Sequence, residues 1–155
     1  MKKNFYVFPP ILTGVNFAIL FPIGIIFLRT ELNLGDRICI AIGAILAIIF
    51  FVSLAVTHKI EQMHMKPNNV DKLITNGIYS IVRHPHYSGT ILMNIACLFF
   101  FRTLWLIPPV CIFFVLWYLE ARHEERALIA KFGASYEAYT KATGMFFPKP
   151  FKPRH

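Results

Sequence analysis

ICIAIGAILAIIFFVSLAVT, residues Ile38–Thr57, carries no charged side chain over its 20 residues. A single helical crossing of a bilayer needs roughly 20 mostly apolar residues. Three more uncharged runs lie on either side of this one: Asn4–Leu28 (25 residues), His84–Phe101 (18) and Thr103–Leu119 (17). Four such runs leave too little polar sequence to cover them in water. The pattern therefore predicts helices that span a membrane.

The composition agrees with this interpretation. Of the 155 residues, 56% are apolar and 15% are charged, whereas a soluble domain carries about 25% charged residues. A soluble globular protein, a disordered chain and a collagen-like repeat are excluded by these values. The length corresponds to a single domain, residues 1–155.

We expect an all-α, polytopic membrane helical bundle with about four transmembrane helices and a cytosolic C-terminal helix. Arg102 and Thr103 form a link so short that the last two spans should make an antiparallel hairpin. The charged segment Glu120–Lys141 should extend the fourth span into water, with Gly133 ending its first part. A long polar connection, His58–Ile81, contains the helix breakers Pro67, Asn68 and Asn69. The expected spans are Phe8–Leu28, Ile38–Thr57, Tyr87–Phe101 and Leu104–Leu119.

The basic residues predict the orientation. Four crossings place both termini on one side, and 13 of the 16 Lys and Arg residues fall there, while Arg29, Arg37 and Arg102 fall on the other. Positive charge marks the cytoplasmic side, so we expect both termini and the active site to be cytoplasmic. Lys2 and Lys3 precede an apolar run too long for a signal peptide, which indicates a retained first span. Because the net charge of +8 flanks apolar runs, it indicates a membrane surface and no nucleic acid partner.

One group of chemically active side chains lies where the polar connection re-enters the membrane. Arg83, His84, His86 and Tyr87 surround Pro85, which favours the start of a helix. The free N–H groups at such a start attract a carboxylate or another polar group. The alternative is an interfacial anchor, since Tyr, His and Arg commonly mark a lipid boundary.

A second group follows the fourth span. Glu124 and Glu125 are adjacent, so on a helix they diverge by roughly 100°. We expect one to face a pocket and the other to pair with Arg122 or Arg126. The alternative is a solvated face with surface ion pairs, but a carboxylate directly below a membrane span is costly unless it is paired or functional.

The remaining candidate ligands do not predict a metal site. Cys39, Cys97 and Cys111 lie inside apolar runs without ligand spacing, and His58 and His64 are not on one helical face. There is also no glycine-rich nucleotide-binding loop.

The two groups together resemble the isoprenylcysteine carboxyl methyltransferase family, whose wider group includes the phospholipid N-methyltransferases. The resemblance covers residues 75–148, about half of the chain. Its first part is Gly77-x-Tyr79-x-x-x-Arg83-His84-Pro85-x-Tyr87-x-Gly89. Its second part is Glu124-Glu125-x-x-Leu128-x-x-x-Phe132-Gly133-x-x-Tyr136-x-x-Tyr139, with a later Pro148.

The resemblance implies an integral membrane methyltransferase that uses S-adenosylmethionine, bound at the cytosolic edge of the bundle. A lipid-like acceptor is expected to enter sideways from the bilayer. The cofactor-binding residues carried over by the motif are Tyr79, His84, Pro85, Tyr87, Gly89 and Glu125. The catalytic candidates are Arg83, Arg122 and Glu124.

The acceptor itself stays open. A carboxylate would need Arg83 or Arg122 as its clamp, whereas an amine would need a Glu or His to accept its proton. Family members often carry Arg at the positions held here by Ala142 and Met145, and their loss makes a prenylcysteine carboxylate doubtful as the acceptor.

Two other functions compete with this prediction. A membrane reductase of the sterol-reductase type shares the Arg-His-Pro-x-Tyr-x-Gly segment and uses NADPH, but lacks the Glu-Glu-x-x-Leu pattern. A non-catalytic membrane subunit would use the charged helix only to dock partners. A polar translocation path would usually need charges at the bilayer centre, and the spans contain none there.

Overall fold

The computed structural model describes residues 9–58 and 71–150. These residues form helices, without a strand in either described range, and the predicted all-α membrane bundle is confirmed. Lys2, Lys3, His64 and the predicted breakers Pro67–Asn69 lie outside the described residues. The α-helices are α1 (Pro9–Ile26), α2 (Leu34–His58), α3 (Pro85–Phe101), α4 (Ile107–Phe132) and α5 (Ala134–Ala142), with short 3-10 helices η3 (Gly77–Ser80) and η4 (Leu104–Leu106).

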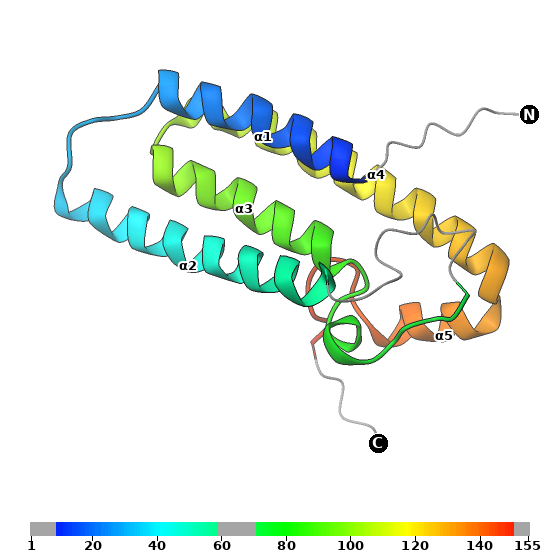
Figure 1. Cartoon of the computed structure of the whole chain (residues 1–155). Coiled ribbons are helices and arrows are strands. Elements are labelled where there is room, and N and C mark those ends of the chain that lie inside the picture. The colour runs from blue at the N-terminus through cyan, green and yellow to red at the C-terminus, as the bar shows by residue number, and fades with distance from the viewer. Residues whose placement is uncertain (1–8, 59–70, 151–155) are drawn as a thin grey trace, which may run out of the picture.

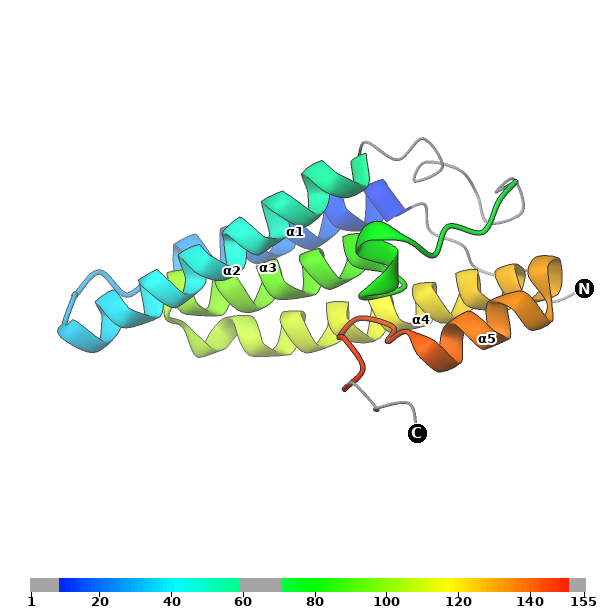
Figure 2. The same cartoon turned by 90° about the horizontal axis from the view of Figure 1, so that it is seen from below.

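Helix α3 lies in the centre of the bundle and packs against α1, α2 and α4 (Figures 1 and 2). Ten of its 17 residues are buried. Gly89 permits the closest approach to α2, because a Cβ there would lie 3.2 Å from Ser53 Oγ and 3.3 Å from Phe50 Cδ2. The first residues of α3 therefore lie among the neighbouring helices α1, α2 and α4.

Three of the described helical segments are long and apolar enough to cross a membrane: Pro9–Ile26, Leu34–Thr57 and Leu104–Phe132. Helix α3, the third span expected from the sequence, is shorter than these at 17 residues. Apolar side chains are exposed along the outer helices, among them Ile19 on α1, Ile48 on α2 and Val115 on α4. Exposed apolar surface of this kind suits contact with lipid.

One helix boundary differs from the sequence expectation. The second span begins earlier than Ile38, because Asn33 and Asp36 cap α2 reciprocally: each side chain accepts a hydrogen bond of 2.9 Å from the other's backbone N–H. The expected helical extension of the fourth span beyond Leu119 is present, since α4 continues without a break to Phe132. Gly133 ends it as expected, with a φ of +53° that L side chains rarely adopt.

A buried polar layer joins α1 to the centre of the bundle. The amides of Asn16 and Asn94 exchange two hydrogen bonds of 2.8 and 2.9 Å, and Trp117 Nε1 donates to Asn16 Oδ1 at 3.4 Å. All three side chains are almost completely buried. The layer fixes how α1, α3 and α4 are placed relative to one another.

Candidate active site

The segment Val82–His84 is held by the stretch that follows α5. Backbone N–H groups of Arg83 and His84 donate to the carbonyls of Gly144 (2.8 Å) and Met145 (3.1 Å), and Val82 forms an isolated parallel bridge with Gly144. A Cβ on Gly144 would overlap the carbonyl of Phe147, so this turn needs glycine. The C-terminal stretch therefore fixes the backbone from which Arg83 and His84 project.

Arg83 connects the start of α3 to both α4 and α5. Its Nε donates to Glu125 Oε1 at 2.7 Å, and its NH1 group donates to the carbonyls of Thr140, at 3.2 Å, and Thr143. The Arg83 and Glu125 side chains are only 8% and 5% exposed. A charge-assisted hydrogen bond of this length between two buried ions is strong. The pair therefore holds the segment before α3 against α4.

His84 lies between the two glutamates. Its Nδ1 is 3.5 Å from Glu124 Oε2, and its Nε2 is 3.3 Å from Glu125 Oε1. Burial alone lowers the pKa of this imidazole, but the hydrogen bonds to Glu124 and Glu125 outweigh burial and raise the pKa above 6.5. The site therefore favours a positively charged imidazolium.

Tyr87 completes the arrangement from the first turn of α3. Its ring stacks on the His84 ring, with centroids 5.3 Å apart and planes at 4°, and lies 4.9 Å from the Trp117 ring. Its hydroxyl donates to Glu124 Oε1 at 2.7 Å. Glu124 is the more accessible of the two glutamates, with a side chain 17% exposed against 5% for Glu125. We call these five residues, Arg83, His84, Tyr87, Glu124 and Glu125, the polar cluster.

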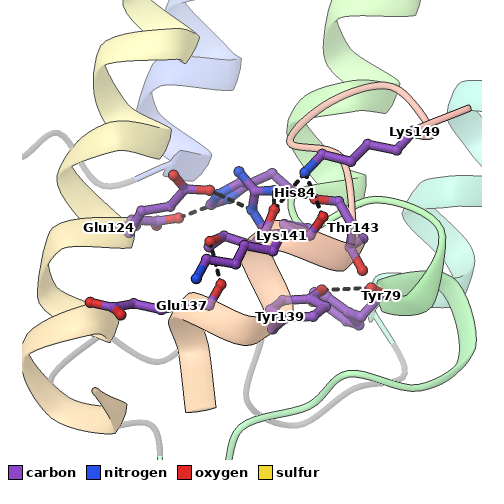
Figure 3. A network of polar contacts seen from close by, with 11 residues as sticks. Tyr79, His84, Glu124, Glu137, Tyr139, Lys141, Thr143 and Lys149 are labelled. Atoms are coloured by element: carbon purple, nitrogen blue, oxygen red, sulfur yellow. Dashed lines mark hydrogen bonds and ion pairs between the residues drawn. The ribbon is translucent and has the colours of Figure 1, made fainter. Parts of the chain in front are cut away.

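Tyr79 and Tyr139 lie beside the polar cluster. The Tyr139 hydroxyl on α5 donates to the Tyr79 carbonyl at 2.5 Å, and Figure 3 shows the two side chains together while Glu124 points to His84. Burial raises the pKa of Tyr139 to about 12, and burial with the charge of Glu124 raises the pKa of Tyr79 above 10. Both phenols therefore stay protonated at neutral pH.

The other predicted site residues lie around or outside this arrangement. Pro85 is buried at the start of α3, and its carbonyl accepts from Ser53 Oγ at 2.8 Å. Gly89 faces α2. Arg122 is exposed, and its carbonyl accepts from Arg126 Nε at 3.3 Å.

The expected pairing of one glutamate with Arg122 or Arg126 is wrong. Glu124 contacts His84 and Tyr87, and Glu125 contacts Arg83 and His84. Arg122 and Arg126 are exposed, whereas Glu125 is buried. The buried Arg83 reaches Glu125 from another segment and provides a partner screened from water.

The sequence does not predict three contributors to the site: the carbonyls of Thr140 and Thr143, and the ring of Phe146. Phe146 is buried with a centroid 6.1 Å from the His84 ring. Every residue has a carbonyl, so no side-chain pattern could single out Thr140 or Thr143. Across residues 9–58 and 71–150, no three His, Cys, Asp or Glu side chains are grouped as a metal site would need.

Comparison with protein families adds an independent finding. The model of the isoprenylcysteine carboxyl methyltransferase family matches residues 36–130, more than half of the chain. The chain belongs to the isoprenylcysteine carboxyl methyltransferase family. The match includes Arg83, His84, Tyr87, Glu124 and Glu125, and membership makes the chain an integral membrane protein of a methyltransferase family. Comparisons with curated proteins and with solved structures gave no match.

Proposed function

We propose that this chain transfers a methyl group from S-adenosylmethionine to a lipid-like acceptor that reaches the site from the bilayer. The observation that carries the proposal is the junction of Arg83, His84 and Tyr87 with Glu124 and Glu125, in a chain of this family. This junction lies at one end of an apolar bundle, where a water-soluble donor and a membrane-embedded acceptor can both arrive. We propose that this end faces the cytoplasm.

The side chains present suit the donor chemically. S-adenosylmethionine supplies an electrophilic methyl group on a cationic sulfonium. Tyr87, whose ring stacks on His84, adds an aromatic ring and a hydroxyl beside Glu124. Glu124 adds a partly accessible carboxylate to the same place. We propose that Tyr87, His84 and Glu124 contact the reacting molecules.

The remaining candidates support these three. Arg83 and Glu125 act as positioning residues, because their contacts hold His84 and connect the start of α3 to α4 and α5. Tyr79 and Pro85 shape the entry to α3, and Gly89 sets its distance from α2. Methyl transfer needs nucleophile, methyl carbon and sulfur in one line, so orientation is the main contribution that such a frame can make.

Binding of S-adenosylhomocysteine to the purified full chain in phosphatidylcholine nanodiscs tests the proposal. We expect calorimetric binding by the wild type and about tenfold weaker binding by Tyr87→Ala and His84→Ala, since each loses part of the ring surface. Glu137→Gln, an exposed change on α5, is the control and should bind like the wild type. No binding to the folded wild type, or binding of NADPH instead, overturns the proposal.

A further inference from the structure

We infer that Arg122 and Arg126 bind the phosphate group of an anionic phospholipid at the membrane surface. This lipid is a bound partner and not a reactant, so the inference does not depend on the proposed methyl transfer. It concerns the face of α4 that is turned away from Glu124. Helix α4 continues without a break from its apolar part into its charged part. One face of the helix can therefore contact both the acyl chains and the phosphate of the same lipid.

The two arginines continue an exposed apolar stripe on α4. Successive members of this stripe are four, three and four positions apart, so they share one helical face: Val115, Leu119, Arg122 and Arg126. Val115 and Leu119 are 53% and 55% exposed, and both arginines are exposed as well. Exposed apolar side chains of a membrane span contact lipid chains. Arg122 follows Leu119 by about 4.5 Å along the helix axis, which places it beside the headgroups of the lipids that the stripe contacts.

The charge of these arginines is not used by the protein. Arg122 and Arg126 are each two positions from Glu124, and two positions correspond to about 200° around a helix. Both therefore lie on the side of α4 opposite to Glu124. Within the described parts of the chain, neither arginine forms an ion pair. Their positive charge is thus available to a group outside the protein.

The direction of the side chains brings this charge toward the membrane. Side chains of an α-helix are tilted toward its N-terminus, and the N-terminal part of α4 is its apolar part. Arg126 shows the tilt directly, because its Nε donates to the carbonyl of Arg122, one turn earlier, at 3.3 Å. Two positive charges four positions apart on a helix repel each other. An anion bound between the two guanidinium groups would remove that repulsion.

The chemistry of the position favours a lipid phosphate as that anion. A guanidinium group donates two parallel hydrogen bonds to a phosphate. Tyr118, which is 44% exposed and one turn before Arg122, is of the residue type that gathers at membrane interfaces. Phosphatidylglycerol offers a phosphate without a cation of its own, whereas the phosphate of phosphatidylcholine is already accompanied by an ammonium group. An anionic phospholipid therefore fits this face of α4 better than a zwitterionic one.

Native mass spectrometry of the full chain in a neutral detergent tests the inference, because it resolves individual bound lipids. The protein is titrated with phosphatidylglycerol or phosphatidylcholine of the same acyl chains. We expect the wild type to bind one phosphatidylglycerol about 25-fold more tightly than phosphatidylcholine, since each arginine contributes about fivefold. Arg122→Gln and Arg126→Gln should each weaken phosphatidylglycerol binding about fivefold, and the double variant should bind the two lipids alike. Lys141→Gln removes the same charge from an exposed position on α5 and should bind like the wild type.

Three results would overturn the inference. Equal binding of the two lipids by the wild type does so without any variant having to fold. An equal loss of phosphatidylglycerol binding in Lys141→Gln and Arg126→Gln would show that net charge alone attracts the lipid. Displacement of phosphatidylglycerol by an equal concentration of inorganic phosphate would show a site for soluble anions instead. None of these measurements uses the methyl donor, so their outcome is separate from that of the proposed function.

Discussion

At the scale of single residues, the two adjacent glutamates should differ in their effect on stability. Glu125→Gln leaves the buried Arg83 without its charged partner, and breaking a buried ion pair costs about 3 kcal/mol. Glu124→Gln should cost less, about 1 kcal/mol, because Glu124 is more exposed and keeps the hydrogen bond from Tyr87. Unfolding by denaturing detergent in mixed micelles measures both, with Glu137→Gln as the control. Equal losses for the two variants would contradict the contacts described above.

His84 predicts a dependence of stability on pH. Its pKa in the folded protein lies above the ordinary value of 6.5, so folding favours the protonated form. The stabilisation is complete below 6.5 and is lost as the pH rises through the raised pKa. The melting temperature of the wild type should therefore fall relative to that of His84→Gln as the pH rises above 6.5.

The phenols cannot produce this dependence, because the pKa values of Tyr79 and Tyr139 are raised above 10 and to about 12. Melting curves of the wild type and His84→Gln at matched ionic strength provide the measurement. Parallel profiles for the two proteins would show that the imidazole is not held by the glutamates.

The sequence identifies most members of the polar cluster but not their pairing. The order of the two motifs predicts that Arg83 and His84 act together with Glu124 and Glu125, and the structure brings these residues together. Local spacing favours Arg122 and Arg126 as partners because they are near in the chain. The actual partner, Arg83, is 42 positions from Glu125, and only the tertiary fold determines such a contact.

At the scale of helices, the amide pair of Asn16 and Asn94 should hold α1 on α3. Asn94→Leu leaves a buried amide on Asn16 without its partner, which costs about 1–2 kcal/mol. Replacing both, as Asn16→Leu with Asn94→Leu, removes both amides and leaves only Trp117 Nε1 without its long acceptor contact, so it should recover part of the loss. Detergent-induced unfolding of the two single variants and the double variant gives the coupling energy. Strictly additive losses would show that the two amides do not act as a pair.

The length and ends of the helices are predicted unequally well. The apolar runs give the position of all four bundle helices, because burial in lipid requires long uncharged segments. The start of α2 is missed because Asn33 and Asp36 form a reciprocal cap inside a segment that appears to be a polar loop. The continuation of α4 beyond Leu119 is predicted, because the charged segment after Glu120 contains no helix breaker before Gly133.

At the scale of the whole molecule, the distribution of positive charge predicts that the end with the polar cluster faces the cytoplasm. Helices α1, α3 and α4 run along one another, and the α1–α2 link lies at the end of the bundle opposite to α5 (Figure 1). Thr30 belongs to that link and Ser135 to α5. Both residues are exposed. With Cys39, Cys97 and Cys111 replaced by Ala, Thr30→Cys in intact cells should react with a membrane-impermeant maleimide. Ser135→Cys should react only after permeabilisation. The physical reason is that 13 of the 16 Lys and Arg residues belong to the Ser135 side. Labelling of Ser135→Cys in intact cells, with Thr30→Cys protected, would place the polar cluster on the other side of the membrane.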